Sequence, residues 1–76
     1  MIQEKVIAIL KEVKPTSDLS GVEDIIEGGY LDSFELMSLI AQLSEGFDVE
    51  IGVDEIAPEN FNSVAAMAAM VERLKG

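Results

Sequence analysis

Apolar residues recur at the three- to four-residue spacing of an amphipathic helix in three stretches of the chain. In the first stretch they are Ile2, Val6, Ile9, Leu10 and Val13, and Pro15 stops the pattern. In the second they are Leu36, Leu39, Ile40 and Leu43, and in the third Val64, Met67, Ala68, Val71 and Leu74. The pattern therefore predicts three main helices, the last of which extends to Gly76.

The second and third of these helices have start and stop signals. Asp32-Ser33-Phe34-Glu35 places an acidic N-cap three residues before a glutamate, which is the arrangement of a capping box. Gly46 then stands where a left-handed C-cap is expected. Asn62-Ser63 is expected to cap the last helix.

The segments between the helices keep apolar anchors among polar residues. The stretch from Pro15 to Leu31 is long, so we expect it to pack on its own apolar side chains, with a helical turn near Val22 to Ile26. Residues 47–51 alternate apolar and acidic, but a lone strand would have no partner. We therefore expect an extended connection there, held by Phe47, Val49 and Ile51.

The remaining predicted element is short. Asp54 to Asn60 is expected to hold a short helix that is interrupted around Pro58. Together the elements predict an all-α fold, a small antiparallel bundle of three main helices plus one short helix. The 76 residues contain no internal repeat and predict a single domain over residues 1–76.

The composition narrows the range of functions. The sequence has no cysteine and no histidine, so it lacks thiolate nucleophiles, Cys-based zinc sites and the usual general bases near neutral pH. We therefore expect a protein that is not an enzyme and has no metal site. No apolar run approaches the roughly 20 residues that cross a bilayer, and no leader is visible, so we expect a cytoplasmic monomer.

Charge is distributed unevenly along the chain. The 15 acidic residues outnumber the 5 basic ones and give a formal net charge of −10. The basic residues lie only near the two ends, at Lys5, Lys11, Lys14, Arg73 and Lys75. Such a chain repels nucleic acid and anionic membranes. Its acidic residues either attract basic protein surfaces or only keep a small domain soluble, and the charge alone favours neither interpretation.

Ser33 is the candidate for chemistry. A serine at a helix start usually serves as the cap, but Asp32 already fills that position here. The Ser33 hydroxyl is therefore left at the first helical position, next to backbone N–H groups that lack intrahelical partners. Because the helix dipole also favours negative charge there, the position suits a phosphate ester.

Residues 29–36 read Gly-Tyr-Leu-Asp-Ser-Phe-Glu-Leu, with the Asp-Ser pair and a large apolar residue at the head of the second helix. This stretch resembles the phosphopantetheine attachment motif of the acyl and peptidyl carrier proteins. Residues 46–51 are similar to the segment after that family's second helix, and residues 61–67 resemble the start of its last helix. The resemblance covers essentially the whole chain and implies an acyl-carrier-like fold.

The resemblance implies a carrier function. A separate phosphopantetheinyl transferase would attach 4'-phosphopantetheine from coenzyme A to Ser33, and the thiol of this arm would carry an acyl group as a thioester between partner enzymes. For an acyl carrier the implied setting is fatty acid biosynthesis and lipid metabolism. Since the chain has no cysteine, the arm would provide its one reactive thiol.

The resemblance also implies contacts with loading ligases or synthases that have basic surfaces. It places Asp32 and Glu35 at acidic positions that face these partners, and we add Glu45 to that face. It places Phe34 and Met37 at apolar contact positions, for which packing in the core is an equal alternative.

Other functions remain open at this point. Residues 30–34 also resemble free-standing aminoacyl carriers of the D-alanyl type, which an adenylating ligase loads. An acidic helical adaptor without a prosthetic group would share the bundle and the charge. A calcium-binding loop over residues 48–59 is disfavoured because Val53 stands where an EF-hand requires glycine. An enzyme with paired carboxylates is disfavoured because we expect no pocket.

Overall fold

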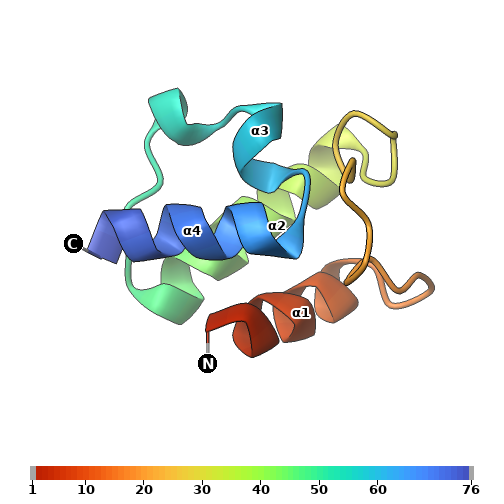
Figure 1. Ribbon diagram of the computed structural model, residues 1–76, viewed down its shortest axis with the longest axis horizontal. Coiled ribbons are helices and arrows are strands. Elements are labelled where there is room, and N and C mark those ends of the chain that lie inside the picture. The colour runs from red at the N-terminus through yellow and green to blue at the C-terminus, as the bar shows by residue number, and fades with distance from the viewer. Residues whose placement is uncertain (1, 76) are drawn as a thin grey trace.

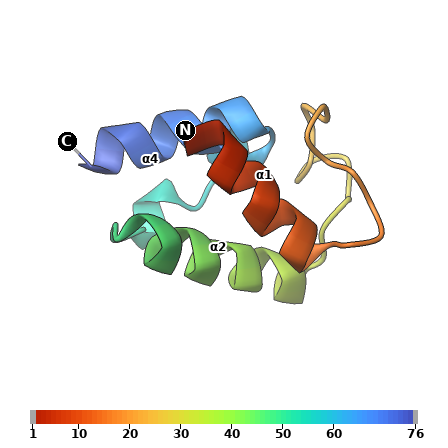
Figure 2. The same ribbon diagram turned by 90° about the horizontal axis from the view of Figure 1, so that it is seen from below.

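The computed structural model describes residues 2–75, and the elements in this range are helices without any strand. They are α1 (Ile2–Val13), α2 (Ser33–Phe47), the 3-10 helix η1 (Val53–Glu55), α3 (Pro58–Phe61) and α4 (Val64–Lys75). Helix α1 runs opposite to α2 and α4 and packs against both, while α3 packs against α4 (Figure 1, Figure 2). The predicted all-α antiparallel bundle is confirmed, and the predicted helix end at Gly76 lies outside the described residues.

The core is built from the predicted apolar stripes. Each α-helix contributes side chains that are shielded from solvent. The largest fully buried side chains of the fold are Phe61, Ile25, Leu39, Leu43, Met67, Met70, Val6 and Val71. Burying one large apolar side chain stabilises a fold by about 1.5–3 kcal/mol. The bundle therefore depends on a few well-packed side chains, one of which comes from the loop and one from the short helix α3.

Within residues 2–75, no helix has the length and apolar character needed to span a bilayer.

The end of α2 differs from the prediction. The helix does not close at Gly46 but continues through Phe47, which is buried, and Asp48 takes the left-handed conformation with φ 54° and ψ 50°. The Asp48 N–H donates to the carbonyl of Ser44, as in a helix cap. Gly46 has a different role, because a Cβ there would lie 3.3 Å from the Cδ1 of Ile9 on α1. The glycine permits α1 and α2 to approach each other closely.

The connection from α2 to α4 is extended and then forms two short helices. Val49 and Ile51 are half-buried and pack against the core, which confirms the extended connection without a strand, although Phe47 belongs to α2. The short helix predicted over residues 54–60, with an interruption around Pro58, is divided into two short helices, because η1 ends at Glu55 and α3 begins at Pro58. Pro58 is the first residue of α3, where its fixed φ and missing N–H are tolerated.

The long loop before α2 is held by Asn62. The Ile25 N–H donates to the Asn62 carbonyl at 2.9 Å, and the N–H groups of Ile26 and Glu27 donate to its Oδ1 at 3.0 and 3.1 Å. These amides are therefore not available for intrahelical bonds, and the helical turn predicted near Val22 to Ile26 is replaced by hydrogen-bonded turns over residues 25–29. The loop does pack on its own apolar side chains, as predicted, because Leu19 and Ile25 are buried.

Of the predicted cap Asn62-Ser63, only Ser63 caps α4. The Oγ of Ser63 accepts the Ala66 N–H at 3.0 Å, so Ser63 caps α4. The Asn62 side chain is used by the loop instead, and its Nδ2 donates to the Oε1 of Glu27 at 2.9 Å.

Asp18 is fixed by a local turn in the same loop. Its Oδ1 accepts the Ser20 hydroxyl at 2.7 Å and the Ser20 N–H at 3.1 Å, and these bonds hold the pKa of Asp18 below its ordinary value. Because the pKa is lowered in the fold, the bonds stabilise the fold above the unfolded pKa, and this contribution is lost as the pH falls through the folded pKa.

Ser20→Ala is expected to raise the pKa of Asp18, which a carbon NMR titration of its carboxyl group measures. An unchanged titration would show that the hydroxyl does not control this carboxylate.

Candidate functional site

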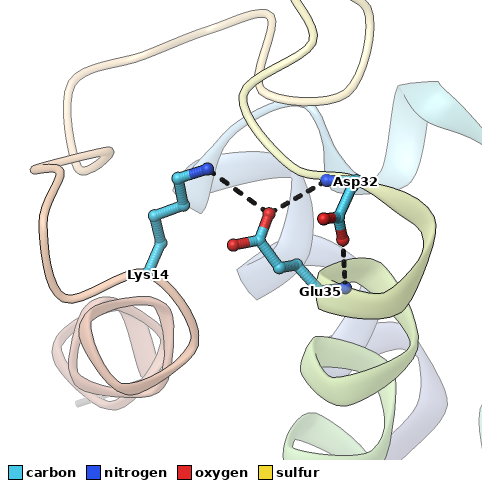
Figure 3. Close-up of polar contacts among 3 residues, drawn as sticks. All are labelled: Lys14, Asp32 and Glu35. Atoms are coloured by element: carbon cyan, nitrogen blue, oxygen red, sulfur yellow. Dashed lines mark hydrogen bonds and ion pairs between the residues drawn. The ribbon is translucent and has the colours of Figure 1, made fainter.

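The start of α2 is fixed by a complete capping box. Asp32 has an extended backbone, and its Oδ1 accepts the Glu35 N–H at 2.7 Å, while the Oε1 of Glu35 accepts the Asp32 N–H at 3.0 Å (Figure 3). The Asp32 carbonyl also accepts the Leu36 N–H at 2.9 Å. The capping box predicted from the sequence is therefore confirmed, with Asp32 as the cap.

Ser33 is the first residue of α2 and is exposed to solvent. Because Asp32 satisfies the Glu35 and Leu36 amides, the Ser33 and Phe34 amides are the donors that remain in the first turn among the described residues. No hydrogen bond of the described part of the chain uses the Ser33 hydroxyl. An exposed hydroxyl at the positive end of a fifteen-residue helix, with free amides beside it, fits a phosphate ester.

Glu35 also pairs with a basic residue from α1. Lys14 follows the last residue of α1, and its Nζ lies 3.3 Å from the Oε1 of Glu35, the same oxygen that accepts the Asp32 N–H (Figure 3). Both side chains are partly buried, with 30% and 23% of their surface exposed. This pair could not be predicted from the sequence, since the two residues are 21 positions apart and nothing in the local pattern links them.

Two exposed apolar side chains lie beside Ser33. Phe34 is 83% exposed and Met37 is 64% exposed, so neither belongs to the core. Met37 is four residues after Ser33 and therefore lies on the same side of the helix. The alternative that these two residues pack in the core is wrong, and a protein that reaches the Ser33 hydroxyl would meet both of them.

Glu45 lies apart from the other predicted contact residues. It is exposed, but it stands ten residues after Glu35, which corresponds to about 15 Å along the helix axis. The structure therefore brings Asp32, Ser33, Phe34, Glu35 and Met37 together in the first two turns of α2, and it places Glu45 near the other end.

The amino-acid sequence is similar to those of known proteins. Residues 2–71 match the family described as "Phosphopantetheine attachment site". A D-alanyl carrier protein of Streptococcus sanguinis (strain SK36) is 30% identical over 76 residues, which cover 97% of this chain and 95% of that protein. The "Probable acyl carrier protein PigG" of Serratia sp. (strain ATCC 39006) is 39% identical over 51 residues, covering 67% of this chain and 59% of that protein.

The family match spans nearly all of the described fold and includes the whole of α2. The relatives are named as carrier proteins, and the described fold is all-helical. The chain therefore belongs to the phosphopantetheine-binding family of carrier proteins, whose prosthetic group is 4'-phosphopantetheine.

Proposed function

We propose that Ser33 is the attachment residue and that the chain carries an aminoacyl group on the attached arm. The observation that carries this proposal is the exposed Ser33 hydroxyl at the first position of α2, whose cap is supplied by Asp32. When bound, the prosthetic group supplies a thiol that forms a thioester with the cargo. An aminoacyl cargo is supported by the relative named D-alanyl carrier protein and by the resemblance of residues 30–34 to such carriers.

Attachment at Ser33 requires a phosphopantetheinyl transferase as a partner, and an aminoacyl cargo requires an adenylating ligase. Carrier proteins of this family interact with transferases and ligases. Asp32, Phe34 and Met37 surround Ser33 on the surface and are proposed as contacts for both enzymes, with Glu45 as a more distant charged contact. Glu35 contributes to the same surface, but its carboxylate is also engaged by Asp32 and Lys14.

Ser33→Ala is expected to abolish attachment and to leave the fold intact. Alanine is at least as good a helix former as serine, and the cap is unaffected, so the free energy of unfolding should stay within about 0.5 kcal/mol of the parent. The parent, incubated with coenzyme A and a broad-specificity transferase, should gain one phosphopantetheine group and one titratable thiol. The Ser33→Ala variant should gain neither. Intact mass and a thiol assay measure the result, without background since the chain has no cysteine.

Ser38→Ala is the matched control, because Ser38 lies on the same helix and is half-buried. It should be modified as fully as the parent. If the parent protein stays unmodified while a known carrier is converted, the carrier function is overturned and the acidic adaptor takes its place. Unfolding of the Ser33→Ala variant would show that the serine is structural.

A second candidate function is the carriage of an apolar acyl group. An open apolar pocket of about 200 Å³ lies beside α2 and is lined by Ile26, Leu36, Ile56, Ala57, Pro58 and Phe61. Leu36 is three residues after Ser33, so the pocket is near the attachment point. To separate the candidates, the modified protein is offered D-alanine and ATP with a D-alanyl-type ligase, and fatty acyl groups with an acyl-loading enzyme. Loading with the fatty acyl group alone would favour the second candidate.

A further inference from the structure

We propose that Lys14 is a positioning residue for the modification of Ser33, because it balances the charge of the helix turn in which the anionic phosphodiester forms. The inference rests on the proposed function of Ser33. It concerns a basic residue on a different segment of the chain, which the attachment motif does not contain.

Lys14 is held in place at the end of α1. Its N–H still donates to the carbonyl of Leu10 at 2.9 Å, so the residue continues the helical path before Pro15. From there its side chain reaches across to α2, where the Nζ meets the Oε1 of Glu35 (Figure 3). That oxygen also accepts the Asp32 N–H, so one carboxylate joins the end of α1 to the cap of α2.

The turn around Ser33 is acidic without Lys14. Asp32 precedes Ser33 directly, and Glu35 follows it by two residues, so two carboxylates belong to the turn that receives the phosphodiester. The other basic side chains with recorded partners in residues 2–75 are engaged elsewhere: Lys5 with the Gly46 carbonyl, Arg73 with Glu55 and Lys75 with the Phe47 carbonyl. Lys14 is the cation that pairs with this turn in the described part of the chain.

The modification adds a negative charge to the same turn. The Oγ of Ser33 attacks the phosphorus of coenzyme A that bears the pantetheine, and a new P–O bond forms as the P–O bond to adenosine bisphosphate breaks. The hydroxyl proton passes to a base of the transferase or to water. The turn then holds three anionic groups, and their mutual repulsion depends on whether Lys14 is present.

The test compares four variants with the parent: Lys14→Met, Lys11→Met, Glu35→Gln and the double variant Lys14→Met/Glu35→Gln. Lys11→Met is the matched control, since it removes the same charge from an exposed position on α1. Each protein is measured for its initial rate of modification at low and high salt. Each is also melted in the unmodified and the modified form.

Lys14→Met is expected to slow modification about fivefold at low salt, which corresponds to the effect of a partly exposed ion pair. High salt should remove most of this difference because it screens the charges. The modification should lower the melting temperature of Lys14→Met by more than it lowers that of the parent or of Lys11→Met. In the Glu35→Gln background, the Lys14→Met substitution should change both measurements much less than it does in the parent, because the carboxylate that Lys14 balances is already absent.

The outcomes separate this inference from the proposed function. A parent that is not modified overturns the proposed function itself. If the parent is modified and Lys14→Met is modified at the same rate as Lys11→Met, the proposed function stands and only the role of Lys14 is overturned. Lys14→Met could instead be modified more slowly while modification lowers its melting temperature no more than that of the parent. This result would mean that Lys14 contacts the transferase, and it would also overturn the role of Lys14 in charge balance. If Lys14→Met does not fold, Lys14→Gln and the conservative Lys14→Arg decide: Lys14→Arg should be modified at the parental rate and Lys14→Gln more slowly at low salt, and equal rates for these two variants overturn the inference.

Discussion

Phe61→Ala is expected to remove about 3–5 kcal/mol from the free energy of unfolding. The ring is 1% exposed and lies in the four-residue helix α3, which has few other buried groups to hold it. A domain of this size has a total stability of about 4–11 kcal/mol, so the loss would be a large fraction of it. Urea denaturation followed by circular dichroism measures the effect as a fall in the midpoint concentration.

Phe34→Ala provides the matched control for Phe61→Ala. It makes the same chemical change at a side chain that is 83% exposed, so its unfolding free energy should stay within about 0.5 kcal/mol of the parent. Because Phe34 is a proposed partner contact, the same variant should be modified more slowly at Ser33. Equal destabilisation by the two substitutions would contradict the placement of Phe61 in the core and Phe34 on the surface.

The main helices and the cap of α2 could be predicted because their causes are local. The stripe of α1 depends on residues three and four positions apart, and the capping box depends on Asp32 and Glu35 within one turn. The position of Ser33 follows from the same turn. The chemistry of the candidate site was thus visible in a segment of four residues, from Asp32 to Glu35.

The end of α2 could not be predicted from its glycine. Left-handed backbone is the usual use of glycine at a helix end, yet here Asp48 adopts it, which aspartate tolerates better than most residues. Gly46 is needed for another reason, the close approach of Ile9 and Lys5 from α1. That requirement belongs to the packing of two helices, and the sequence near Gly46 does not contain it.

The long loop and the Lys14 pair depend on contacts between distant segments. Asn62 binds the amide of Ile26 across 36 positions of sequence, and Lys14 reaches Glu35 across 21. A polar residue with a distant partner has the same local pattern as one that faces solvent. The local sequence therefore predicts a helix cap at Asn62 and shows Lys14 only as part of the charge distribution.

Asn62→Ala is expected to loosen the loop that leads into the candidate site. The substitution removes the Oδ1 that accepts two amides, from Ile26 and Glu27, and the Nδ2 that donates to Glu27. Leaving the partly buried Ile26 amide without an acceptor costs about 1–3 kcal/mol, whereas the exposed Glu27 amide can bind water instead. The bond from the Ile25 N–H to the backbone carbonyl of residue 62 does not need the side chain, so the loop should loosen rather than detach.

Amide hydrogen exchange at Ile26 and Glu27 measures this change, because each amide loses its acceptor in the Asn62→Ala variant. Asn60→Ala is the matched control: its Nδ2 donates to the carbonyl of Glu55 at 2.7 Å, so it links η1 to α3 and does not touch the loop. Faster exchange of both loop amides is expected in the Asn62 variant alone, together with a lower unfolding free energy. Since this loop runs directly into Asp32, slower modification of Ser33 is expected to accompany the faster exchange. Exchange that stays at the parental rate would show that other contacts, such as the buried Leu19 and Ile25, hold the loop without Asn62.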